Sequence, residues 1–141
     1  MKRKLIALTF ISTILATSFS AQANPTTEKG GVLTTKEGRA LYTFDKDSTG
    51  HSNCSGGCLA AWPPFAVSNA AMADADFTVI KREDGTQQWA YEGKPLYLFS
   101  GDANPGDMNG DNKNGVWHLI RSGAKPAAAK PSSSYSSYGS Y

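Results

Sequence analysis

The sequence is poor in the residues on which most enzymatic and metal chemistry depends. It contains two histidines and two cysteines among 141 residues. It has no His-Glu-x-x-His motif, and no serine in the strand-to-helix turn typical of serine hydrolases. These absences exclude the common metalloprotease and hydrolase constellations, so we expect a protein that is not an enzyme.

Charge of one sign and helical periodicity are also missing. Without Lys2, Arg3 and Lys4, 11 basic residues face 12 acidic ones, so the sequence predicts no nucleic-acid partner. After residue 23 no apolar pattern keeps helical spacing over three turns, whereas short β-prone runs alternate with Gly-containing turns. We therefore predict an all-β domain, an antiparallel hairpin meander with long loops and little helix.

The first 23 residues have the composition of a signal peptide. A basic start precedes an apolar run over 5–19, and Ala21-Gln22-Ala23 forms a small-x-small cleavage site. A membrane anchor is the rival interpretation, but the run is shorter than the roughly 20 residues that a spanning helix needs. No cysteine near the site would carry a lipid. We expect cleavage after Ala23 and a periplasmic or secreted product that neither spans the membrane nor carries a lipid anchor.

Residues 122–141 form a Ser- and Tyr-rich segment without aliphatic side chains larger than alanine. Such a segment buries too little apolar surface to offset the entropy of ordering, so we predict a disordered tail. The alternative is that its tyrosines, Tyr135, Tyr138 and Tyr141, contact a wall polymer or a partner. Residues 24–121 are then the domain.

The domain contains a duplication. Glu-Gly-basic-x-Leu-Tyr-x-Phe-x-x-Asp stands at residues 37–47 and again at 92–102, and the same offset of 55 places Trp62 on Trp117. We predict two pseudo-equivalent repeats, about 30–66 and 77–121, each packing its Tyr-x-Phe strand on its own tryptophan. The repeated residues are Tyr42, Phe44, Asp47 and Trp62 in the first copy and Tyr97, Phe99, Asp102 and Trp117 in the second.

Local signals place the strands. Val32–Thr35 and Ala40–Phe44 read as a hairpin, and an Asp-Gly turn joins 77–81 to 87–91 in a second one. A strand over 95–99 carries the second motif, and 116–120 closes the domain. One helical turn is expected around 59–62, before Pro63 and Pro64 stop it.

Cys54 and Cys58 are the only cysteines, and in an exported protein a pair predicts a disulfide. The alternative adds His51, because two thiolates and an imidazole could hold copper, or zinc with a fourth ligand. Met108 and His118 are further candidates for such a metal or redox site.

The second half has an Asp/Asn-rich loop in place of the cysteines. Asp107, Asn109 and Asp111 match the first half of a calcium loop, but Asn112 and His118 stand where Gly and Glu are needed. These residue types also form ordinary turns through their own backbone. Turn formation is the leading interpretation, and a weak calcium site is the alternative.

Asp47, Asp102 and His118 are the only catalytic candidates. The repetition of the two aspartates is explained more simply if each caps the turn after its strand by accepting backbone N–H groups. At the offset of 55 residues, the counterpart of His118 in the first repeat is Pro63, so the duplication requires no histidine at this position. We expect structural roles for all three.

The motifs resemble those of the exported bacterial family described as secreted repeats, or predicted lipoproteins, with a Tyr-x-(Phe/Trp/Tyr)-x-x-Asp motif. The resemblance extends through Asn53–Cys58, Trp62-Pro63-Pro64, Gln88–Tyr91 and Gly115–His118, and so covers residues 30–121. It implies no assigned activity and no catalytic residues. Some relatives are lipid-anchored or occur beside redox modules, but this chain lacks a lipobox cysteine and a haem-attachment motif.

Together these features predict an exported β module with a non-catalytic binding or structural role and an envelope or extracellular partner. No cofactor is expected, with copper or calcium as the alternatives. A periplasmic copper or redox accessory that uses His51, Cys54 and Cys58 is the competing function.

Overall fold

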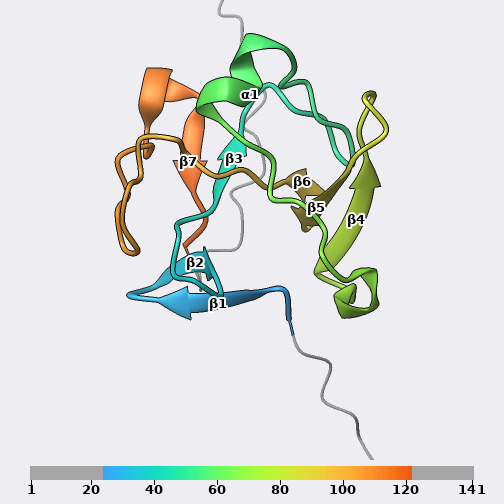
Figure 1. Cartoon of the computed structure of the whole chain (residues 1–141), viewed down its shortest axis with the longest axis horizontal. Helices are drawn as coiled ribbons and strands as arrows, with labels where there is room; N and C mark the ends of the chain where they lie inside the picture. Colours follow the sequence, from blue (N-terminus) through green and yellow to red (C-terminus); the bar gives the residue numbers. More distant parts are fainter. Residues whose placement is uncertain (1–23, 122–141) are drawn as a thin grey trace, which may run out of the picture.

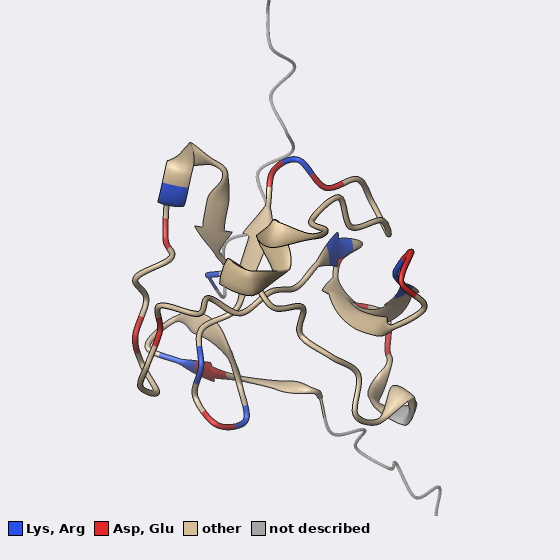
Figure 2. Ribbon diagram, turned by 45° about the horizontal axis from the view of Figure 1, so that its top comes forward, with Lys and Arg blue, Asp and Glu red and all other residues tan. Residues whose placement is uncertain are grey.

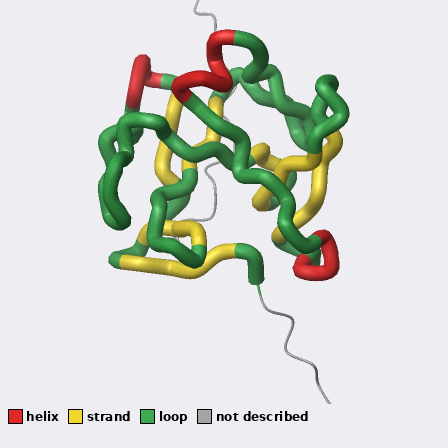
Figure 3. The backbone as a smooth tube through the Cα atoms, viewed as in Figure 1, coloured by secondary structure: helices red, strands yellow, loops and turns green. Residues whose placement is uncertain are grey.

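The computed structural model describes residues 24–121, and the predicted signal peptide (1–23) and tail (122–141) lie outside the described residues. Within residues 24–121, seven short strands are joined by long loops, and helical structure is confined to three short segments (Figures 1 and 3). The strands are β1 (Thr26–Lys29), β2 (Val32–Thr35), β3 (Tyr42–Phe44), β4 (Phe77–Lys81), β5 (Gln87–Tyr91), β6 (Lys94–Pro95) and β7 (Trp117–Leu119). The helical segments are α1 (Gly57–Ala61), η1 (Ala70–Met72) and η2 (Lys113–Gly115).

All strand pairings among the described residues are antiparallel, and they form three small sheets. β1 pairs with β2, β3 pairs with β7, and β4, β5 and β6 follow one another in a three-stranded sheet. In Figure 1 the β1–β2 hairpin lies at the bottom, the β4–β5–β6 sheet at the right, and β3 with β7 above the hairpin and to the left of that sheet. The predicted all-β class is confirmed.

The first hairpin differs from the predicted one. Val32–Thr35 pairs along its whole length with β1, through a turn in which Gly30 and Gly31 have φ values of 59° and 77°. Two positive φ angles define the tight turn that matches strand twist, and glycine adopts them without strain. On its other side β2 meets the predicted partner only at a bridge between Thr34 and Ala40. β1 was not predicted from the sequence, because only one of its four residues is buried.

The second hairpin is as predicted. β4 and β5 pair from Phe77 opposite Tyr91 to Lys81 opposite Gln87, around the Asp-Gly turn. The chain then reverses at Glu92-Gly93, and Pro95 lies opposite Ala90 on β6. Trp89, which is 1% exposed, packs with Leu41, Phe77 and Leu96 in a core cluster beneath this sheet. Trp89 has no counterpart in the repeat motif.

The two repeats meet at their tyrosines. The backbone N–H of Tyr42 donates to the carbonyl of Tyr97, and the N–H of Tyr97 donates to the carbonyl of Tyr42, each at 2.9 Å. This reciprocal pair places a pseudo-two-fold axis between two chemically equivalent segments, β3 and the residues that follow β6, where the predicted strand over 95–99 is reduced to isolated bridges at Tyr97. The duplicated motifs therefore face each other across the centre of the domain.

Strand pairing on either side of this axis is exchanged between the repeats. β3 of the first repeat pairs with β7 of the second, with Phe44 opposite Trp117. Correspondingly, Leu98 N–H donates to the Pro63 carbonyl at 2.8 Å, which joins the second motif to the tryptophan segment of the first. The prediction that each Tyr-x-Phe strand packs on its own tryptophan holds for the tyrosines, which contact the tryptophan of their own repeat. It is wrong for the phenylalanines and for the strand pairing, which both involve the tryptophan segment of the other repeat.

Four aromatic rings stack across the axis in the order Phe44, Trp117, Trp62, Phe99. The two indoles lie parallel, 3.8 Å apart between ring centroids, and a phenyl ring lies 4.2 or 4.5 Å from each outer face. Tyr42 and Tyr97 meet Trp62 and Trp117 edge-on at 5.4 and 5.2 Å. Each such aromatic pair is worth about 0.5–1.5 kcal/mol beyond its buried area. The stack joins the two repeats into one core.

This close packing explains Gly110. A Cβ atom at that position would lie 2.7 Å from Trp62 and 3.0 Å from Tyr42, and both rings are fixed by the stack. Gly57 in α1 has an ordinary φ and no atom within 4 Å of such a Cβ. The two glycines form a matched pair of sites.

We expect Gly110→Ala to lower the free energy of unfolding by about 1–3 kcal/mol, because the added methyl group must displace packed rings. Gly57→Ala should leave stability unchanged or raise it by up to about 1 kcal/mol, since alanine restricts the unfolded chain. Urea unfolding followed by tryptophan fluorescence measures both. Equal stability of the two variants would contradict this description of the core.

Candidate functional site

The repeated aspartates accept hydrogen bonds from the tyrosines of the opposite repeat. Tyr42 Oη donates to Asp102 Oδ2 at 2.6 Å, and Tyr97 Oη donates to Asp47 Oδ2 at 2.7 Å. The other carboxylate oxygen of each aspartate accepts a backbone N–H, from Asn109 to Asp102 and from Asn53 to Asp47. Each carboxylate thus fixes a loop of its own repeat to a tyrosine of the other, a pairing that the sequence pattern did not indicate.

The environment keeps these hydroxyl groups protonated. Burial, followed by the hydrogen bond to Asp102, raises the pKa of Tyr42 well above its usual range. Burial is also the main cause that raises the pKa of Tyr97. The pKa of Asp47 is raised by burial too, although the Asn53 N–H and the Tyr97 hydroxyl oppose that effect.

The two Tyr–Asp pairs differ in what lies beyond them. Asp102 is 4% exposed, and Tyr42 Oη also accepts the Gly110 N–H at 3.2 Å, so this pair is closed by backbone. Tyr97 Oη instead contacts Ser52 Oγ at 2.6 Å. Since the tyrosine proton goes to Asp47, Ser52 donates to Tyr97. The Tyr97–Asp47 pair is therefore the one that is linked through Ser52 to further side chains.

Arg82 continues that chain of hydrogen bonds. It directly follows β4, and its side chain is only 4% exposed. Its Nη1 donates to Ser52 Oγ at 2.7 Å and to Gln88 Oε1 at 2.6 Å, and its Nη2 donates to the Cys54 carbonyl at 2.6 Å. Gln88 is itself held by the Leu96 carbonyl. Arg82 therefore ties the β4–β5 hairpin to the cysteine-containing loop.

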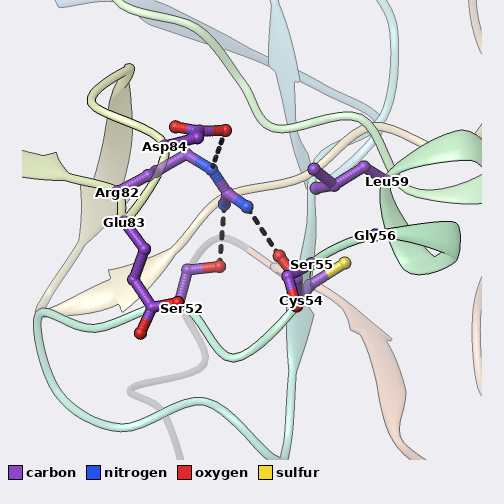
Figure 4. Close-up of a pocket in the computed structure, with 8 residues that line it drawn as sticks. All are labelled: Ser52, Cys54, Ser55, Gly56, Leu59, Arg82, Glu83 and Asp84. Carbon is purple, nitrogen blue, oxygen red and sulfur yellow. Dashed lines mark hydrogen bonds and ion pairs between the residues drawn. The ribbon is translucent and has the colours of Figure 1, made fainter.

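A cleft of about 330 Å³ lies over this arginine (Figure 4). It runs between the loop of the first repeat and the β4–β5 turn. Arg82 Nε is the one buried side-chain nitrogen or oxygen without a hydrogen-bond partner in residues 24–121, and Asp84 Oδ2 lies 3.7 Å from it. The lining residues are Ser52, Cys54, Ser55, Gly56, Leu59, Arg82, Glu83 and Asp84.

Cys54 and Cys58 form the predicted disulfide, with 5.5 Å between their Cα atoms. Both sulfur atoms are thus bonded to each other rather than free to act as thiolate ligands. His51, the third residue of the metal hypothesis, lies with Nε2 4.0 Å from Glu83 at the mouth of the cleft. Across the described residues, no three His, Cys, Asp or Glu side chains are grouped as metal ligands would be.

The candidates of the Asp/Asn-rich loop contact separate partners. Asp107 accepts the Asn104 N–H at 2.9 Å, and Asn109 Nδ2 donates to the Gly101 carbonyl. Asp111 accepts the Leu119 N–H and pairs with Arg121 at 2.7 Å. Each side chain is engaged by a nearby backbone or cationic group.

His118 and Met108 lie apart from both Tyr–Asp pairs. His118 Nε2 lies 2.9 Å from Asp45 Oδ2, on the exposed side of the β3–β7 pair, so its carboxylate partner is neither Asp47 nor Asp102. Met108 is 38% exposed in the second loop. The three catalytic candidates do not converge on one site.

The sequence did not single out Arg82, Gln88 or Ser52. Arg82 stands within Lys81-Arg82-Glu83-Asp84, four consecutive charged residues of the kind found in solvated turns. The one signal available in the sequence was that Arg82 directly follows a predicted strand and precedes the Asp-Gly turn. Charges elsewhere on the ribbon are dispersed, with neither sign gathered on one face (Figure 2).

The fold and the exchanged core define a class, the two-repeat all-β domain whose halves share one aromatic stack. A family described as "secreted repeat of unknown function" matches residues 25–66 and 78–121. The chain belongs to this family of secreted repeats, with two copies. No curated protein and no solved structure matched the chain. Within residues 24–121 no helix is long and apolar enough to cross a membrane.

The asymmetry of the Tyr–Asp pairs predicts unequal effects of two chemically identical substitutions. Tyr42→Phe leaves Asp102 Oδ2 and the Gly110 N–H without their buried partner, so we expect a loss of about 2–3 kcal/mol in unfolding free energy. Tyr97→Phe should cost about 1 kcal/mol, because Ser52 and water can reach the half-buried Asp47. Chemical denaturation of both variants measures this difference, and equal losses would contradict it.

The raised pKa values of the tyrosines predict a loss of stability at high pH. The folded state keeps these protons to higher pH than the unfolded chain, whose tyrosines ionise near pH 10. Their contribution is therefore complete below about pH 10 and is lost as the pH rises further. Between pH 8 and 11 the unfolding free energy of Tyr42→Phe should fall less steeply than that of the wild type, by up to about 1.4 kcal/mol per pH unit. Parallel curves would be the contrary result.

Proposed function

We propose that this protein is an exported, non-catalytic binding module of the cell envelope, and that the cleft over Arg82 is its binding site. The observation that carries the proposal is the broken pseudo-symmetry. One Tyr–Asp pair is closed by the Gly110 backbone, whereas its counterpart leads through Ser52 to Arg82 and the cleft.

The non-catalytic part of the proposal is supported by how the candidate groups are engaged. Asp47 and Asp102 each accept a tyrosine hydroxyl and a backbone N–H, which are bonds that hold the repeats together. The cleft offers a guanidinium, two carboxylates and one serine hydroxyl near its mouth, Ser55. No base lies against that hydroxyl among the contacts of the described residues, so recognition is the better-supported role.

Action in the periplasm or outside the cell belongs to the same proposal. It is supported by the secreted family, by the disulfide, which persists in oxidising compartments, and by the signal-like start of the sequence. The competing function, copper or redox chemistry through His51, Cys54 and Cys58, requires reduction of the disulfide before either sulfur can bind a metal.

Filling the cleft with a bulky side chain tests the proposal. Ser55 is exposed on its rim, so Ser55→Trp should fill it, while Ser100→Trp places the same side chain on an exposed loop elsewhere. In co-sedimentation with isolated envelopes, we expect the wild type and Ser100→Trp to bind alike and Ser55→Trp to bind at least tenfold more weakly. That factor corresponds to about 1.4 kcal/mol of binding free energy.

Two results would overturn the proposal. Undiminished binding by Ser55→Trp would remove the cleft from the interaction. Stoichiometric copper in protein purified from its native compartment, measured by elemental analysis, would favour the metal function instead.

A further inference from the structure

Two N–H groups of Arg82, which lines the cleft, have no hydrogen-bond acceptor within residues 24–121, and the Nε of one of them is buried. A guanidinium has five N–H donors. Two of them, on Nη1, are used by Ser52 and Gln88, and one on Nη2 is used by the Cys54 carbonyl. The Nε–H and one Nη2–H are left, on a side chain that is 4% exposed. Buried donors of this kind are costly unless an acceptor reaches them.

An acceptor of the protein lies just out of reach. Asp84 Oδ2 is 3.7 Å from Arg82 Nε, beyond hydrogen-bond distance. The carboxylate is held there because its Oδ1 accepts the Thr86 N–H at 2.9 Å and the Thr86 hydroxyl at 2.6 Å. Figure 4 shows Asp84 and Arg82 facing each other, with Leu59 and Ser55 across the cleft. A fixed donor and a fixed acceptor thus stand side by side.

One atom that both donates and accepts can satisfy this pair. A hydroxyl oxygen accepts from Nε–H and gives its proton to Asp84 Oδ2. An amide group divides these roles between two atoms, because its oxygen only accepts and its nitrogen only donates. The geometry at Arg82 and Asp84 therefore favours a hydroxyl group over a peptide group.

The charges around the cleft favour a neutral ligand. Arg82 contributes one positive charge, and Glu83 and Asp84 contribute two negative charges at the rim. A phosphate or carboxylate drawn to Arg82 would meet both rim carboxylates, which opposes its binding. The volume of about 330 Å³ is at the lower end for small-molecule sites, and the half-buried Leu59 supplies an apolar wall for C–H groups.

We propose that the cleft binds a neutral, hydroxyl-rich ligand, namely one or two sugar units of a glycan. This inference deepens the proposed binding function and rests on it. One ring hydroxyl bridges Arg82 Nε and Asp84 Oδ2, and an adjacent hydroxyl reaches Glu83 at the rim. The apolar face of the ring lies against Leu59.

The test is an NMR titration of the ¹⁵N-labelled full mature chain with defined probes. The neutral probes are tri-N-acetylglucosamine and maltotriose, the charged probe is trigalacturonate, and trialanine amide represents a peptide. With at least one neutral sugar we expect saturable shifts confined to residues 52–59 and 82–84. Asp84→Asn, which turns the acceptor beside Nε into a donor, should weaken that binding about tenfold or more.

Asp74→Asn is the matched control. Asp74 is an exposed turn aspartate that likewise accepts a backbone N–H two residues on, but it does not line the cleft. It should bind the sugar as the wild type does. Asp84→Asn removes the ion pair with Arg82 but keeps the three hydrogen bonds of the guanidinium to Ser52, Gln88 and the Cys54 carbonyl. Its amide spectrum reports whether the fold is intact, so the comparison does not depend on a variant that fails to fold.

The outcomes separate this inference from the proposed function. Shifts at the cleft with trialanine amide or trigalacturonate but with neither neutral sugar would overturn the sugar assignment and leave the cleft as a binding site. Sugar binding that Asp84→Asn does not weaken would also overturn it. If no probe shifts the amide resonances of the cleft residues, the sugar assignment is overturned. The envelope co-sedimentation of Ser55→Trp then decides the broader binding function independently.

Discussion

The fold depends on the hydrogen bonds that the two repeats exchange at their tyrosines. Tyr42 and Tyr97 bond each other through the backbone and bond the aspartate of the opposite repeat through their hydroxyls. Each aspartate receives one backbone N–H from its own repeat but takes its tyrosine hydroxyl from the other. Neither repeat could bury its aromatic face alone, since a two-stranded unit of this size is marginal in water. The duplication therefore yields one cooperative domain rather than two.

The two Tyr–Asp pairs of this core differ in their surroundings. The pair of Asp102 and Tyr42 is closed off by the Gly110 backbone. At the equivalent place beside Asp47 and Tyr97, Ser52 of the first repeat and Arg82 of the second take the position of that backbone, and a cleft lies over Arg82. The disulfide shapes the loop on one side of the cleft, although so short a loop restricts little unfolded-chain entropy. The same scaffold thus surrounds one Tyr–Asp pair with backbone and places the other beside a cleft.

Local patterns predicted those parts of the fold that are local in origin. The β4–β5 hairpin follows from an Asp-Gly turn between β-prone runs, and the disulfide follows from two cysteines in an exported chain. β1 was missed because its sequence, Thr26–Lys29, exposes three of its four residues, and its strand form depends on pairing with β2. Arg82 was missed because a buried arginine in a run of charges has the same local signature as a solvated one.

The sequence by itself determined the all-β class, the 55-residue duplication and the identity of the aromatic residues that meet at the centre of the domain. A repeated motif shows which side chains are equivalent, but equivalence along the chain does not say which copy partners which. Tertiary structure decided that Phe44 stacks on Trp117 and Phe99 on Trp62, because burial of four rings in one stack requires contacts between segments far apart in the sequence. The cleft has the same origin, since Ser52 and Arg82 become neighbours only when the two halves interlock.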